Sequence, residues 1–176
     1  YNDIMSQAYI HSDMAIGFAY ENMADSAIYH AEKSIDAGNK FKDPFTISYM
    51  QMGYAETLLL INKPDQALPW AKRAYALSKK QNSRTLVRAA LKILEEVHEA
   101  LGNSSEALRL YKLFKAYDDT ILKMNINERI LQKEKEIQIQ ENAQLSSINA
   151  LQLTNISQKR VLIFSFLIFS SILLVA

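Results

Sequence analysis

Histidine is the side chain best suited to proton transfer or metal binding near neutral pH, and the chain has three: His11, His30 and His98. No two of them have the spacing of a metal-ligand pair, and the pattern His-Glu-x-x-His does not occur. The absence of cysteine excludes disulfides and thiolate metal sites. A glycine-rich phosphate loop and a nucleophile elbow are also absent. We therefore expect no catalytic residue, no metal and no cofactor, and we look for recognition instead of catalysis.

The charge balance and the helix-breaking residues indicate an all-α protein that does not bind nucleic acid. Lys and Arg number 20 against 19 Asp and Glu, so a net charge of +1 provides no attraction to a phosphate backbone. The four glycines and three prolines all lie within residues 1–102. Long stretches without breakers favour helix, and few segments show the two-residue alternation of strands.

A repeat of 40 residues organises the first two thirds of the chain. Small residues recur at this shift, as do turn residues and large apolar residues: Ala15 and Ala55; Ala27, Ala67 and Ala107; Asn22, Asn62 and Gly102; Met14, Tyr54 and Leu94. Small side chains let antiparallel helices approach closely, and Asn and Gly tolerate the left-handed backbone of a tight turn. The pattern predicts helices over residues 3–21, 25–38, 44–61, 65–80, 84–101 and from 104 onward.

Capping residues mark several of these helix ends. Asp43 and Pro44 form an N-cap followed by a first helical residue, and Ser83 and Ser104 are further N-cap candidates. Pro69 falls early in the predicted fourth helix, where it removes one backbone hydrogen bond.

The repeat resembles the tetratricopeptide repeat over residues 1–117. The segment LKILEEVHEALGNSSEALRLYKLF carries the resemblance best, with Leu94, His98, Gly102, Ala107 and Tyr111 at the characteristic places. The usual early Trp is missing, and the period is 40 in place of the common ~34. The resemblance implies a solenoid of three antiparallel helix pairs. An unrelated antiparallel helical array is the alternative. Because the chain begins at Tyr1 and ends in an apolar run, we read it as a fragment with further repeats before Tyr1.

In tetratricopeptide arrays the first helix of each pair lines a concave groove that holds a peptide or a partner helix. Transferring that register predicts a protein or peptide ligand contacting Tyr9, Ser12, Ile16, Tyr20, Tyr49, Met52, Glu56, Leu59, Lys92, Glu96 and Glu99. The alternative is that the apolar members of this set are core between repeats. For Lys92 and Glu96 the alternative is an ordinary solvated surface.

Residues 118–160 are polar and carry as many basic as acidic residues. Ile130, Ile137 and Leu151 follow a heptad that fails at Gln144, which is a weak coiled-coil pattern. We expect a helical stalk here. It either pairs with a second copy of the chain to give a homodimer or stays a single solvated helix.

Residues 161–176, VLIFSFLIFSSILLVA, carry no charge. A helix of this length spans about 24 Å, against about 30 Å of membrane hydrocarbon, so we predict a truncated transmembrane helix. A tail anchor is the alternative. Lys159 and Arg160 precede the run, and by the positive-inside rule they place the repeats in the cytoplasm.

The order of elements resembles a Bacteroidetes-type bacterial signalling architecture. That order is helix pairs, the segment LFKAYDDTILKMNINERILQKEKEIQIQE, a polar helix and one span. That resemblance implies periplasmic repeats, a single pass through the inner membrane, and a kinase or helix-turn-helix regulator beyond it. The expected function is a sensory module that passes a binding signal through the stalk. A membrane-tethered scaffold for protein–protein interaction, with no output domain, is the alternative. An enzymatic activity would need a domain outside this sequence.

Overall fold

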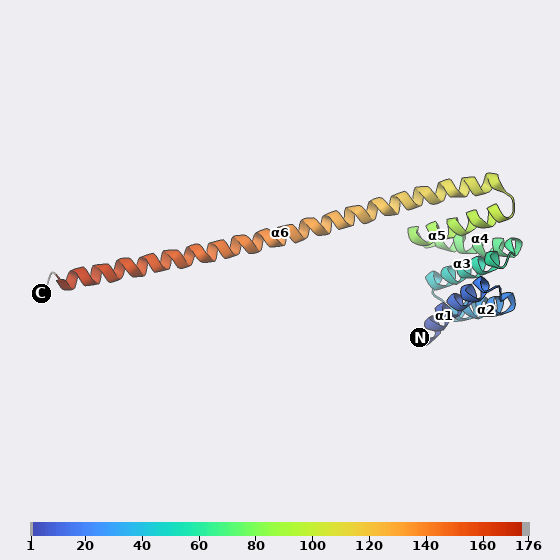
Figure 1. The fold of residues 1–176 in the computed structure, drawn as a ribbon, viewed down its shortest axis with the longest axis horizontal. Helices are drawn as coiled ribbons and strands as arrows, with labels where there is room; N and C mark the ends of the chain where they lie inside the picture. Colours follow the sequence, from blue (N-terminus) through green and yellow to red (C-terminus); the bar gives the residue numbers. More distant parts are fainter. Residues whose placement is uncertain (1, 174–176) are drawn as a thin grey trace. The chain divides into compact units, whose positions relative to one another are not determined.

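The computed structural model describes the backbone of residues 2–173 and the side chains of residues 3–167. Within these residues all regular structure is α-helical: α1 (Asn2–Tyr20), α2 (Ala24–Phe41), α3 (Pro44–Leu60), α4 (Pro64–Lys80), α5 (Arg84–Ala100) and α6 (Ser104–Leu173). Figure 1 shows α1 to α5 as successive antiparallel neighbours joined by short turns. The all-α prediction is confirmed, and each predicted helix end that is described lies within three residues of its observed place.

The chain divides into two units, one ending at Lys123 and one beginning at Met124. The helix pairs lie in the first unit. The second unit belongs to α6, and all of its described side chains are exposed. The predicted boundaries at residues 117 and 160 remain predictions.

The turns between helices repeat every 20 residues, half the period seen in the sequence. Asn22, Lys42, Asn62, Asn82 and Gly102 each end a helix with a positive φ between 53° and 75°. After four of these turns the next N–H donates to a carbonyl five residues back, as from Lys63 to Leu58 at 2.8 Å. This left-handed ending satisfies carbonyls that a helix C-terminus leaves unpaired. The predicted turn role of Asn22, Asn62 and Gly102 is therefore confirmed.

Lys42 is the turn residue with the most strained backbone for its side chain. It has φ 59° and ψ 16°, and its N–H donates to the Gly38 carbonyl at 3.1 Å at the helix end. A side chain with a Cβ is strained in this conformation, whereas glycine is not. We expect Lys42→Gly to raise the free energy of unfolding by about 1 kcal/mol. Urea denaturation followed by Trp70 fluorescence measures this change. Asn82→Gly is the matched control and should give a smaller gain, because Asn tolerates the left-handed region. Equal gains would contradict the strain.

The core of the first unit consists of small residues at the helix crossings and branched residues between them. The aligned alanines are all buried: Ala15, Ala27, Ala55, Ala67 and Ala107. Leu58, Leu91 and Val97 fill the larger spaces and belong to one cluster that joins α3, α4, α5 and the start of α6. The small-residue prediction is therefore confirmed.

A glycine lets α1 approach α3 closely. A Cβ at Gly53 would collide with the Ser12 hydroxyl oxygen. Ser12 is consequently only 3% exposed. Gly38 similarly faces Met50, whose sulfur accepts a hydrogen bond of 2.6 Å from the Ser34 hydroxyl. These close approaches determine which residues of α1 remain available at the surface.

The predicted caps are observed at two of three places. The Asp43 carboxylate accepts from the Thr46 N–H at 2.7 Å and from the Thr46 hydroxyl at 2.8 Å, and these bonds lower the pKa of Asp43. The Ser83 hydroxyl accepts from the Leu86 N–H at 3.4 Å. Ser104 is already the first residue of α6, so its predicted N-cap role is wrong by one position.

The apolar run 161–176, predicted from the sequence to be a transmembrane helix, is helical as far as Leu173, and residues 174–176 lie outside the described part. No helix among the described residues is long and apolar enough to cross a membrane. Residues 161–173 span only about 20 Å as a helix, against about 30 Å of hydrocarbon. The described residues therefore do not support the predicted span.

Candidate partner-binding face

The first helices α1, α3 and α5 carry a polar and aromatic surface that we call the first-helix face. It comprises Tyr9 and Asp13 from α1, Tyr49 and Glu56 from α3, and Lys92, Glu95 and Glu96 from α5. The rings of Tyr9 and Tyr49 lie with their centroids 5.2 Å apart at an interplanar angle of 54°. This tilted aromatic contact joins α1 to α3 on the face and leaves Tyr49 39% exposed.

Two carboxylates influence the Tyr49 side chain. Burial raises the pKa of the Tyr49 phenol, and the nearby charges of Asp13 and Glu56 raise it further. Burial is the main cause of the raised pKa, and the two carboxylates add to it because a neighbouring negative charge disfavours the phenolate. Tyr49 therefore combines an exposed aromatic ring with an acidic environment.

Glu56 is the half-buried carboxylate at the centre of the face. Burial raises its pKa, and the negative charge of Glu96 across on α5 raises it further. Among the described residues, no Lys, Arg or His lies within ion-pair distance of Glu56. A partly desolvated charge without a counter-ion is unfavourable, and a cation brought beside it would be stabilised.

The basic residue of the face, Lys92, is already paired. Its ammonium lies 3.0 Å from Glu95 and 3.1 Å from Glu96. The hydrogen bond to Glu95 is the main cause of a raised pKa for Lys92. Two carboxylates thus share one cation, and the first-helix face keeps an excess of negative charge.

The structure separates the eleven predicted contact residues into surface and core. Tyr9, Tyr49, Glu56, Lys92 and Glu96 come together on the face. Ser12 and Met52 are buried, and partly buried Leu59 packs against the core cluster. Met52 and Leu59 match the alternative interpretation as core residues, which did not include Ser12. Ile16 is partly buried, while Tyr20 and Glu99 are exposed near the ends of their helices.

Asp13 and Glu95 belong to the face but are missing from the residues predicted by family register. Asp13 lies four residues after Tyr9, and Glu95 lies three after Lys92. Residues three and four apart share a side of a helix. Helical spacing alone could therefore have added Asp13 and Glu95 to the predicted contact residues.

A histidine pair holds α1 to α2 away from this face. The Nδ1 atoms of His11 and His30 are 2.8 Å apart, and the His30 ring stacks on Phe18 with centroids 5.2 Å apart. One neutral imidazole donates its Nδ1–H to the other, which a doubly protonated pair cannot do. Burial lowers the pKa of His11, and His30 and Lys33 lower it further.

The histidine pair predicts a loss of stability in mild acid. Because the folded-state pKa of His11 lies below 6.5, the unfolded chain binds more protons than the folded chain in the window just below pH 6.5. The contribution of His11 to the free energy of unfolding is therefore fully present above pH 6.5 and decreases as the pH falls. Urea denaturation at pH 7.5 and 5.5, followed by Trp70 fluorescence, measures the decrease.

The matched variant His11→Gln isolates this contribution. The raised pKa of Glu56 acts in the opposite direction, since protonating that carboxyl favours the folded state. Glu56 is present in both proteins, so the difference between them comes from His11. The wild type should lose more stability than His11→Gln between pH 7.5 and pH 5.5. Equal losses would show that the pair does not couple protonation to folding.

The described residues contain no group of three or more His, Asp or Glu placed to hold a metal. No protein-family model matches the chain, and no curated protein matches it. Among solved structures, the crystal structure of the TPR domain of Arabidopsis FLU is similar with a TM-score of 0.59. The two chains are 16% identical, and the match covers 66% of this chain and 98% of that domain. The helix pairs have a tetratricopeptide-like fold.

The sequence resemblance is thus confirmed at the level of the fold. A likeness at this identity shows the fold alone, and the function must be argued from the surface. The negatively charged, aromatic first-helix face is therefore the surface from which the function is argued.

Proposed function

We propose that the helix pairs form a protein- or peptide-binding module whose first-helix face takes a segment carrying a basic side chain. The observation that carries the proposal is Glu56, a half-buried carboxylate with no cationic partner among the described residues, beside the exposed ring of Tyr49. An incoming Lys or Arg supplies the missing positive charge.

The chemistry of the face suits a long cationic side chain. The methylene stem packs on the Tyr9 and Tyr49 rings, and the cationic group contacts ring faces and carboxylates together. A cation over an aromatic ring contributes about 0.5–2 kcal/mol, depending on its desolvation. A hydrogen bond to a charged group contributes about 1.5–3 kcal/mol. A single basic side chain therefore gives a large part of the affinity of a short peptide.

The test compares two pools of fluorescent peptides, each nine residues long with a fixed central residue and random flanks. The centre is an equal mixture of Lys and Arg in one pool and Glu in the other. Fluorescence anisotropy with the full chain should show at least tenfold tighter binding of the basic pool. This preference should weaken as salt is raised from about 50 to 500 mM, because ions screen the carboxylates. Equal binding of both pools would refute the proposed specificity.

A wider proposal places this module in a sensor. Ligand binding would alter the first unit, and α6 would carry the change to a following output domain in a single-span inner-membrane protein with periplasmic helix pairs. The support is the signalling resemblance and the absence of Gly and Pro from residue 103 onward. Membrane placement rests on the sequence of residues 161–176, since the described residues contain no span.

The transmission step has its own test in the intact protein. Inserting four glycines after Ser146 breaks helix continuity without touching the helix pairs. Signal output should be lost while peptide binding stays unchanged. Unchanged output would favour the alternative of a tethered scaffold. A homodimer through residues 118–160 is part of the same proposal, and sedimentation of the full chain in detergent distinguishes a dimer from a monomer.

A further inference from the structure

His11 on α1 and His30 on α2 lie 19 residues apart in the sequence, but the fold brings their rings together. Their Nδ1 atoms are 2.8 Å apart, and their ring centroids are 5.1 Å apart. Two nitrogen ligands at right angles around one ion, each with a bond of about 2.0 Å, are separated by about 2.8 Å. The two Nδ1 atoms therefore already have the separation of neighbouring ligands of one metal ion.

Aromatic contacts hold the His30 ring in place. It stacks on Phe18 with centroids 5.2 Å apart at an interplanar angle of 17°, and the Tyr29 ring meets it edge-on at 5.2 Å. Both histidines are only partly buried, and the last side-chain torsion of histidine is soft. The tilt that directs both Nδ1 lone pairs at one ion therefore falls mainly on the His11 ring.

The protonation of the pair is compatible with metal binding. A metal ion binds neutral imidazole, and burial, together with His30 and Lys33, lowers the pKa of His11 and so favours its neutral form. In the hydrogen-bonded pair one Nδ1 carries the shared proton. When that ring changes to its Nε2–H tautomer, both Nδ1 atoms present a lone pair.

A small cavity beside the pair gives water access to the bound ion. It has a volume of about 240 Å³, and its lining includes His11, Gln7, Lys33, Asp36 and Lys40. This volume holds several water molecules, each of which occupies about 30 Å³ in the liquid. Lys33 and Lys40 oppose a dication, but both side chains are exposed and screened by salt, and the Asp36 carboxylate supplies the opposite charge.

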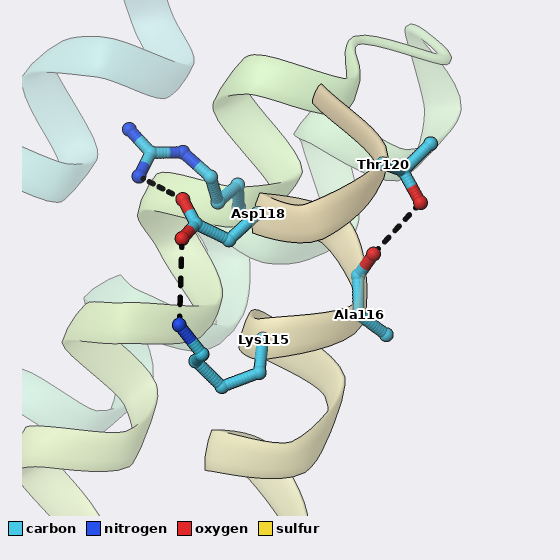
Figure 2. Close-up of polar contacts among 5 residues, drawn as sticks. Lys115, Ala116, Asp118 and Thr120 are labelled. Carbon is cyan, nitrogen blue, oxygen red and sulfur yellow. Dashed lines mark hydrogen bonds and ion pairs between the residues drawn. The ribbon is translucent and has the colours of Figure 1, made fainter. Parts of the chain in front are cut away.

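The acidic group at the start of α6 lacks this availability. The Asp118 carboxylate lies 3.0 Å from the Arg88 guanidinium and 3.6 Å from the Lys115 ammonium, and Figure 2 shows it directed at both cations. A metal ion at Asp118 would have to displace these two cations. The rings of His11 and His30 contact each other, so a metal ion there displaces only one shared proton.

We propose that His11 and His30 bind one divalent transition-metal ion through their Nδ1 atoms, with water molecules completing its coordination. Imidazole suits Cu²⁺, Ni²⁺ and Zn²⁺, and affinity at a given site is highest for Cu²⁺. The right-angle ligand separation also matches the square-planar or tetragonal geometry of Cu²⁺. The ion joins α1 to α2, and its binding is independent of the first-helix face.

Isothermal titration calorimetry of the untagged full chain at pH 7.5 tests the proposal. CuCl₂ should give one saturable binding event per chain, and ZnCl₂ should bind more weakly. MgCl₂ should give no binding, because Mg²⁺ prefers oxygen ligands. The chain has no cysteine, so thiolates do not compete for the ion. No saturable binding of CuCl₂, or equally tight binding of MgCl₂, would overturn the proposal.

Variants of the three histidines show where the ion binds. His11→Gln and His30→Gln should each weaken CuCl₂ binding at least tenfold, because each leaves a single nitrogen ligand. His98→Gln is the matched control on α5 and should change the affinity less than twofold. If His98→Gln weakened binding as much as His11→Gln, copper would bind histidines in general and the proposal would fail.

A measurement on the wild type avoids any effect of the variants on folding. In the isotope-labelled full chain, ZnCl₂ should shift the ring Nδ1 resonances of His11 and His30 together and in a saturable way. The His98 Nδ1 atom is buried, so a hydrated ion does not reach it and its resonance should stay in place. Unchanged Nδ1 resonances of His11 and His30 at saturating ZnCl₂ would contradict binding through these atoms.

Discussion

Replacing Leu91 by alanine should lower the free energy of unfolding by about 3 kcal/mol. Leu91 is fully buried in α5, in the cluster that includes Leu58 on α3 and Ala71 on α4. The alanine loses the transfer energy of the removed methyl groups and leaves a cavity that rigid helices cannot refill. Trp70 is the only tryptophan, and its ring centroid lies 4.8 Å from that of Tyr54 at an interplanar angle of 33°, so its fluorescence during urea unfolding reports on this core.

The matched control is Leu108→Ala on α6. Leu108 is 55% exposed, so its truncation should change the free energy of unfolding by less than about 0.5 kcal/mol. Both substitutions remove the same atoms from a helix and have the same effect on helix propensity. A similar loss from both would mean that the helix pairs do not share a packed core around Leu91.

Reversing the charge at Glu56 should have the largest effect on binding. With Glu56→Lys, the central carboxylate that attracts a basic ligand becomes a cation that repels it. We expect the basic peptide pool to bind at least fiftyfold more weakly, a change of about 2.3 kcal/mol. Fluorescence anisotropy with the same pool measures this change. Glu56→Gln removes the charge alone and should give an intermediate loss.

Glu128→Lys is the control for this charge reversal. Glu128 is exposed in the second unit, far along the sequence from Glu56. Its replacement by Lys changes the net charge by the same amount as Glu56→Lys. It should leave binding of the basic pool within twofold. If Glu128→Lys weakened binding as much as Glu56→Lys, overall charge and not the first-helix face would explain the affinity.

The helix pattern was predictable because its signals are local. Asp43 caps a helix through its own Thr46, and Asn22 and Asn62 adopt the left-handed turn that their side chains tolerate. The 20-residue spacing of the turns was missed, because a shift of 40 aligns only alternate turns. Asn82 has the same tolerance as Asn22, but Lys42 does not and adopts the left-handed region all the same. Sequence self-comparison therefore found only every second turn.

The surface was less predictable because it depends on contacts between helices. Helical spacing puts Ser12 on the same side as Tyr9, but the lack of a Cβ at Gly53 lets α3 cover Ser12. Glu56 was predicted as a contact residue from register, whereas its lack of a cation follows only from the positions of α3 and α5.

The central claim is that the first-helix face binds a basic segment. Its most direct measurement is the amide chemical-shift map of the labelled full chain on addition of the basic peptide pool. We expect saturable shifts concentrated at Tyr9, Asp13, Tyr49, Glu56 and Glu96, with little change in α2 and α4. Shifts confined to α2 and α4, or no saturable shift on α1, α3 and α5, would contradict the claim.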